Sequence, residues 1–126
     1  MQQYSLDCEF DVTRRIGWSE DDLGTHIDDV VEYLRQSSEV TGIDVTADLE
    51  NGRTAATIAF ASWEMRRYEH ATSTVAVAIR AAGGKHEGLL PFAEEAHMKQ
   101  DGAGWSALRS PTWLLRKAEL IDDGEA

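Results

Sequence analysis

The sequence predicts one α+β domain whose elements follow the order strand, helix, strand, strand, helix, strand. Three observations predict this order. Apolar and polar residues alternate over residues 4–12, an Asn-Gly pair separates two further alternating segments, and two other segments carry apolar residues at helical spacing. The chain has 126 residues, of which 42% are hydrophobic, and this suffices for one domain with its own core.

The first strand is expected over residues 4–12, where the alternation is unbroken. Such a pattern is typical of a strand with one buried and one solvated face. The inward residues are Tyr4, Leu6, Cys8, Phe10 and Val12, and the outward residues are Ser5, Asp7, Glu9 and Asp11. Because a buried cysteine behaves as a small apolar residue, Cys8 is interpreted as part of the core and not as a nucleophile.

The first helix is expected to begin after Ser19. Ser19 is a favourable N-cap residue, Asp22 completes a capping box, and two acids between them complement the helix dipole. The apolar residues that follow at helical spacing are Leu23, Ile27, Val30, Val31 and Leu34. We expect this helix to end near residues 36–38.

The two alternating segments around Asn51-Gly52 predict a β-hairpin. Asp44 and Asp48 face outward from the first of these strands. The second strand, over residues 53–61, has Ala56, Ile58 and Phe60 as its inward residues. The Asn-Gly pair predicts a type I′ turn, in which both central residues have positive φ.

A second helix is expected between Ser62, as its N-cap, and Gly83-Gly84, which ends it. Its apolar stripe comprises Met65, Tyr68, Ala71, Val75, Ala78, Ile79 and Ala82. Because residues 72–79 are rich in β-branched side chains, a strand remains the alternative there. A short strand over residues 87–90 is expected to follow.

This order of elements resembles the ferredoxin-like fold, a split βαββαβ arrangement. The resemblance implies a four-stranded antiparallel sheet with two helices on one face, formed by residues 1–91, in which the third strand lies between the first and the second. It is a resemblance to a fold and not to a family, so it implies no activity.

Residues 92–126 are expected to form a C-terminal docking segment with a disordered end. Ser110-Pro111 has the pattern of an N-cap followed by a first helical residue, which predicts a terminal helix. Residues 112–120 fit a strand as well, and this alternative stays open. We expect residues 92–121 to pack against the α+β domain, either their own or that of a second copy.

The net charge of -11 disfavours two classes of partner. Residues 1–62 carry thirteen acids and four arginines, so the field of the N-terminal half repels phosphate backbones and anionic lipids. Neither nucleic acid nor a membrane is therefore expected as a partner. The alternative interpretation is that the acids serve solubility only.

No catalytic residue, cofactor or metal site is predicted from the motifs. The catalytic and metal-binding spacings GxSxG, HExxH, CxxC and the EF-hand are absent from the sequence. Glu94 and His97 have the spacing of a metal-binding helix, but a di-metal site needs two such motifs, so a metal ion there stays open. The single cysteine and the charged start of the chain predict a location in the reducing cytoplasm.

A partner-binding surface is expected on the outward face of the sheet and in the C-terminal segment. The small outward residues of the third strand, Ala55, Thr57 and Ala59, would floor a groove with acids on both sides. The C-terminal segment adds tryptophan and arginine, which are enriched at interface hot spots. The expected partner-binding residues are Asp7, Glu9, Asp11, Asp44, Asp48, Trp105, Arg109, Trp113 and Arg116.

These features predict a non-catalytic acidic interaction module that self-associates or binds a basic protein partner. One alternative is a small dimeric enzyme or ligand binder with a pocket between sheet and helices. Another is a structural subunit of a larger assembly, including a viral one. A sizeable pocket with buried polar groups would favour the enzyme, whereas a shallow acidic surface would favour the module.

Overall fold

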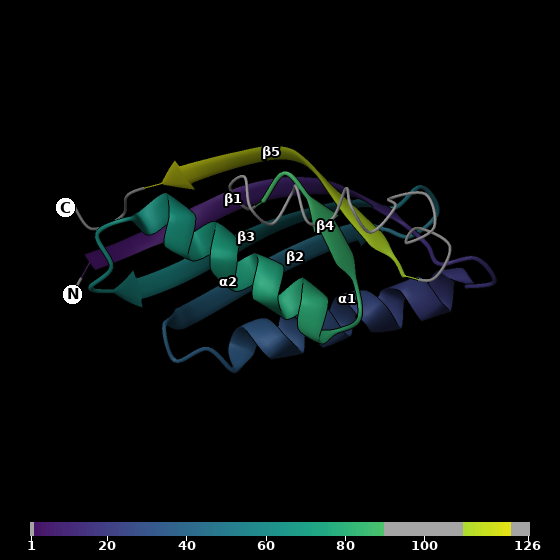
Figure 1. The fold of residues 1–126 in the computed structure, drawn as a ribbon, viewed down its shortest axis with the longest axis horizontal. Helices are drawn as coiled ribbons and strands as arrows, with labels where there is room; N and C mark the ends of the chain where they lie inside the picture. Colours follow the sequence, from purple (N-terminus) through teal and green to yellow (C-terminus); the bar gives the residue numbers. More distant parts are fainter. Residues whose placement is uncertain (1, 90–109, 122–126) are drawn as a thin grey trace, which may run out of the picture.

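The sheet runs through the centre of the molecule, and both helices lie on one side of it (Figure 1). The computed structural model describes residues 2–89 and 110–121. The elements in chain order are β1 (Gln2–Thr13), α1 (Glu20–Arg35), β2 (Val40–Asp48), β3 (Arg53–Ser62), α2 (Arg67–Ala81), β4 (Lys85–Glu87) and β5 (Thr112–Ile121). None of the helices in these ranges is long and apolar enough to cross a membrane.

The fold is α+β, but the expected four-stranded antiparallel sheet is wrong. The sheet has five strands in the order β2-β3-β1-β5-β4, and β5 pairs with β4 in parallel. The third strand lies between the first and the second, as the ferredoxin-like order predicts. The difference arises because β5 pairs with β1 and thereby separates β4 from it. Thr112–Ile121, which were expected in a docking segment, lie inside the sheet.

A bulge explains why β5 could also be interpreted as a helix. The pairing with β1 shifts register between Glu9 and Phe10. The β5 residues that pair with inward positions of β1 therefore have odd numbers on one side of the bulge and even numbers on the other. Leu115 is the partner of Phe10, and Ala118 is the partner of Cys8. Their spacing of three residues imitates helical periodicity.

The core lies between the sheet and the two helices. All five inward residues of β1 are buried, and Tyr4 stacks on Phe60 of β3 with ring centroids 5.3 Å apart. The start of α1 is confirmed: Ser19 Oγ accepts a hydrogen bond from the Asp22 amide at 3.2 Å, and the Ser19 amide donates to Asp22 Oδ2 at 2.9 Å. These reciprocal bonds satisfy two donors at the helix start.

The turn between β2 and β3 is not of type I′. Among the described residues only glycines have positive φ, so Asn51 does not adopt the conformation that this turn requires. The carboxylate of Asp48 instead accepts from the Glu50 amide at 3.1 Å and from Asn51 Nδ2 at 2.9 Å. The Gly52 amide donates to the carbonyl oxygen of Asp48 at 2.8 Å. These bonds stabilise a longer loop that needs positive φ at Gly52 alone.

The second helix is confirmed, but it starts later than expected. Ser62 pairs with Gln2 as the last residue of β3, so it cannot be the N-cap, and α2 begins after Arg66 without a side-chain cap. The residues between strand and helix are therefore outside the core. Trp63 is 76% exposed and Met65 is 88% exposed, whereas the helical pattern had placed Met65 on the buried stripe.

Candidate partner-binding site on the open face of the sheet

The face of the sheet opposite the helices carries most of the predicted site residues. We call it the open face. Its cross-strand rows run from β1 through β3 to β2, and the middle residue of each row is small or polar. The rows are Asp7–Thr57–Asp44, Glu9–Ala55–Thr46 and Asp11–Arg53–Asp48. The strand alternation thus places all five predicted acids on one face.

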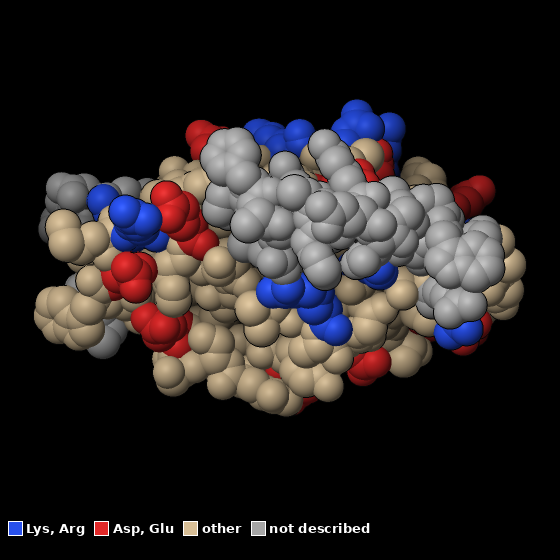
Figure 2. All heavy atoms as spheres, in the orientation of Figure 1, with Lys and Arg blue, Asp and Glu red and all other residues tan. Residues whose placement is uncertain are grey.

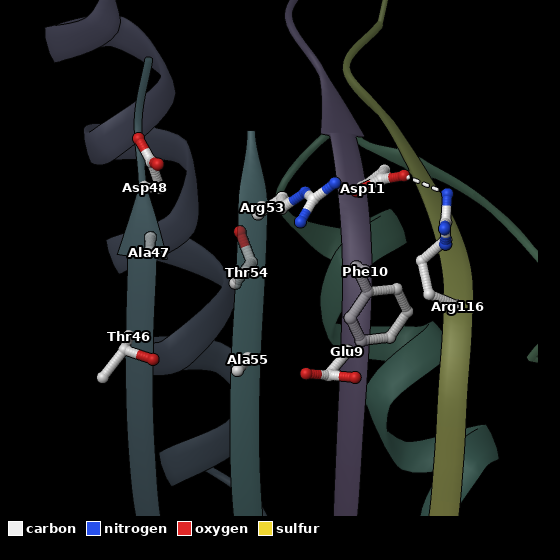
Figure 3. A pocket seen from close by; sticks show the side chains of 10 residues that line it. All are labelled: Glu9, Phe10, Asp11, Thr46, Ala47, Asp48, Arg53, Thr54, Ala55 and Arg116. Atoms are coloured by element: carbon white, nitrogen blue, oxygen red, sulfur yellow. Dashed lines mark hydrogen bonds and ion pairs between the residues drawn. The ribbon is translucent and has the colours of Figure 1, made fainter. Parts of the chain in front are cut away.

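A shallow groove of about 470 Å³ crosses this face between β2 and β5. Its residues are Glu9, Phe10, Asp11, Thr46, Ala47, Asp48, Arg53, Thr54, Ala55 and Arg116. Figure 3 shows Ala55 between Thr46 and Glu9, with Asp48, Arg53 and the Asp11–Arg116 pair toward one end. The small side chain of Ala55 leaves room for an incoming side chain beside the exposed carboxylate of Glu9.

Two arginines make the groove less acidic than the sequence predicted. Arg116 Nη1 lies 2.7 Å from Asp11 Oδ2, and this pair links β5 to β1. Arg53 is the Cα partner of Asp11 on the other side. Arg53 was missed, although its alternation with Ala55 puts it on the open face. Against these two arginines stand three acids, so the groove itself is only mildly negative.

The remaining acids of the open face differ in their contacts. Asp7 Oδ1 accepts a hydrogen bond from Thr57 Oγ1 at 3.0 Å, and Asp48 stabilises the hairpin loop through the bonds described above. Glu9 and Asp44 have no ion-pair partner among the described residues, although Lys117 of β5 lies opposite Glu9 in the register. Glu9 and Asp44 are thus the two acids best able to bind an external cation.

Trp113 does not lie on the open face. It is 3% exposed, packs edge-on against Phe10, and its Nε1 donates a hydrogen bond to Nε2 of His26 at 2.9 Å. Its role in the structure is to join β5 to α1. The predicted site residues Trp105 and Arg109, and the metal-ligand candidates Glu94 and His97, lie outside the described residues.

Replacing Trp113 with phenylalanine should lower the free energy of unfolding by about 2 kcal/mol, because His26 Nε2 would be buried without its donor. Denaturant titration followed by circular dichroism measures this loss. Trp18→Phe is the matched control, since Trp18 is less buried and packs against the His26 ring, with ring centroids 5.6 Å apart, without donating a hydrogen bond to it. Equal losses in the two variants would contradict a role for the bond.

The interior between sheet and helices holds a cavity of about 20 Å³, with apolar neighbours such as Ile27 and Val30, and a more open hollow of about 270 Å³ lies at its edge between α1 and β2. The interior cavity is the one that the ligand-binding alternative requires. Its volume is far below that of a metabolite site. Cys8 lies there, and burial raises the pKa of its thiol to about 12, so the thiol stays protonated at neutral pH. Within residues 2–89 and 110–121, no three His, Cys, Asp or Glu residues gather closely enough to hold a metal ion.

Comparisons of the chain with protein-family models, with curated proteins and with solved structures found no match. The function proposed below is therefore inferred from the geometry of the site.

Proposed function

We propose that the protein is a non-catalytic interaction module that binds a basic polypeptide segment across the open face of its sheet. The observation that carries this proposal is the groove over Ala55, which lies beside exposed acids on the face of the sheet that neither α1 nor α2 covers (Figure 1). The tight apolar packing between sheet and helices supports the module over the ligand-binding alternative. We further propose the reducing cytoplasm as its location, which the buried free thiol of Cys8 supports.

The chemistry of the face favours a partner with lysine or arginine side chains. A long cationic side chain could lie over Ala55 and place its charge near Glu9, while a second one could pair with Asp44. Exposed pairs of this kind contribute less than about 1 kcal/mol each. We therefore expect charge to provide specificity and fast association, and the groove to provide contact area.

The experiment measures the binding of a labelled peptide of alternating arginine and alanine by fluorescence anisotropy. The double variant Glu9→Lys with Asp44→Lys should weaken binding at least about tenfold at low salt, because it removes both unpaired carboxylates and adds repulsion. Asp48 is left intact because its side chain stabilises the hairpin loop.

A matched control separates the site from the net charge of the whole chain. Asp28→Lys with Glu32→Lys changes the charge by the same amount at exposed positions of α1, on the helical side of the sheet. This control variant should bind the peptide almost as the unmodified protein does. Equal weakening in both double variants would reject the open face as the binding site.

A further inference from the structure

An exposed apolar cluster lies where β3 ends and α2 begins, away from the groove. It consists of Trp63, Met65 and Tyr68, which are 76%, 88% and 43% exposed, and we call it the loop cluster. Six residues of chain span at most ~22 Å, so the three residues lie within one small region of the molecule. Tryptophan, methionine and tyrosine are enriched at the centres of protein interfaces.

The charges near the loop cluster are close to balance, unlike those of the chain as a whole. Residues 63–69 contain Glu64 and Glu69 against Arg66 and Arg67, which sum to zero, whereas the chain carries -11. Glu39 adds one acid near this segment, with its Oε1 3.3 Å from His70 Nε2. Arg66 Nη1 lies 3.5 Å from Glu69 Oε2, and both side chains are mostly exposed. Figure 2 shows acidic and basic side chains next to uncharged atoms at the end where α2 begins.

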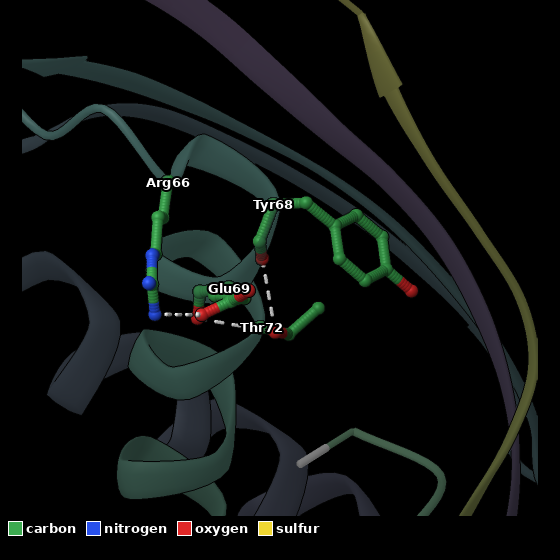
Figure 4. A network of polar contacts seen from close by, with 4 residues as sticks. All are labelled: Arg66, Tyr68, Glu69 and Thr72. Carbon is green, nitrogen blue, oxygen red and sulfur yellow. Dashed lines mark hydrogen bonds and ion pairs between the residues drawn. The ribbon is translucent and has the colours of Figure 1, made fainter. Parts of the chain in front are cut away.

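The first turn of α2 holds these groups in a defined arrangement. Thr72 Oγ1 donates to the carbonyl oxygens of Tyr68 and Glu69, at 2.9 and 3.2 Å. Figure 4 shows the Arg66–Glu69 pair on one side of this turn and the Tyr68 ring extending to the other. The Tyr68 ring and the charged pair therefore leave the first turn of α2 in opposite directions (Figure 4).

We infer that the loop cluster is a self-association surface whose partner is a second copy of this chain. Two copies with a charge of -11 each repel one another over most of their surfaces, so they approach best where the local charge is close to zero. A contact with twofold symmetry also requires a self-complementary patch. A segment that carries exposed apolar side chains and both signs of charge can meet this requirement, because Arg66 of one copy can face Glu64 or Glu69 of the other.

The size of the patch predicts a reversible dimer. Its three side chains, with a polar rim, correspond to the weaker class of protein contacts, below about 1,200 Å² in total. We expect a dissociation constant in the micromolar range or above. The dimer would leave the open face accessible, so this inference is independent of the proposed function.

The test is sedimentation equilibrium of the full chain over a range of concentrations. We expect a monomer–dimer equilibrium that Trp63→Ala with Met65→Ala weakens at least about tenfold. The matched control is Ile16→Ala, since Ile16 is 69% exposed but lies in another loop, and it should not change the equilibrium. Arg66→Glu should also weaken the dimer, because it makes the cluster negative in both copies.

Salt distinguishes this surface from the groove. Raising the salt from about 0.05 M to about 0.5 M should strengthen the dimer by screening the repulsion between the two chains. Contacts between the acidic groove and basic groups should instead weaken. A monomer at all concentrations, or a dimer that is unchanged by the Trp63 and Met65 variant, overturns the inference. A dimer that salt weakens and that Glu9→Lys with Asp44→Lys dissociates also overturns it, and supports the open face instead.

Discussion

Replacing Gly52 with alanine should lower the free energy of unfolding by more than about 3 kcal/mol. Gly52 has a φ of +79°, which is strained for any residue with a Cβ atom. A Cβ atom there would also overlap the carbonyl oxygen of Val12, which is backbone and cannot turn aside. The carbonyl of Gly52 accepts a hydrogen bond from the Val12 amide at 2.8 Å, so the overlap falls on the contact that joins the hairpin loop to β1.

Gly83→Ala separates the two causes. Gly83 has a similar φ of +89°, but a Cβ atom there would meet nothing within 4 Å. The Gly83→Ala variant should lose about 1 kcal/mol of its free energy of unfolding, from backbone strain alone. Urea denaturation of both variants measures the difference. If Gly52→Ala costs no more than Gly83→Ala, the close approach of Gly52 to β1 has no energetic importance.

Acidification from pH 7 to pH 5 should destabilise the protein through two buried histidines. His86 is 2% exposed, its Nε2 has no hydrogen-bond partner among the described residues, and burial together with the nearby Arg80 lowers its pKa from 6.5 to about 4. Burial also lowers the pKa of His26, although a backbone hydrogen bond with Ala82 opposes this. Because Nε2 of His26 accepts from Trp113, protonation there would remove that bond.

The direction follows from the protons that each state binds. Above pH 6.5 both histidines are neutral in the folded and the unfolded chain, so their contribution does not change. Below pH 6.5 the unfolded chain takes up protons that the folded chain excludes, and stability falls by up to about 1.4 kcal/mol per pH unit for each histidine. For His86 the loss is complete near pH 4, at about 3 kcal/mol in total.

His86→Leu tests the assignment. Leucine fills a similar volume and does not titrate, so the variant should lose much of the pH dependence between pH 7 and pH 5. At pH 7 it should be about as stable as the unmodified protein, because the Nε2 that it removes makes no hydrogen bond. Denaturant titrations at both pH values provide the comparison. If the free energy of unfolding of this variant depends on pH as that of the unmodified protein does, His86 is not the source of the pH dependence.

Local signals in the sequence predicted the elements whose partners lie nearby in the chain. The capping box at Ser19 describes the structure correctly, and so does the alternation of residues 4–12, except that Ser5 of the outward set is buried at 7% exposed. The position of β5 could not be predicted, because the bulge opposite Glu9 interrupts its alternation. The exposure of Trp63 could not be predicted either, since it depends on how far β3 continues its pairing with the start of β1.

In the candidate site too, local sequence signals predicted some features, whereas others depend on strands that are distant in the chain. Strand parity placed Glu9 and Asp44 on one face, and the order of β1, β3 and β2 brings them to the same side of the sheet. The partner of Asp11 was not foreseeable, because the ion pair with Arg116 depends on a strand from the far end of the chain. The binding role of these acids remains a prediction.

The position of β5 between β1 and β4 has a consequence for biosynthesis. Among the described strands β1 is made first and β5 last, yet β5 pairs with β1 from Ser5 to Thr13. Until β5 emerges from the ribosome, that edge of β1 carries unpaired amide and carbonyl groups, which invite pairing with other chains. Because β5 pairs with the first strand of the chain, its contacts with β1 join residues far apart in the sequence, and contacts of such separation slow folding.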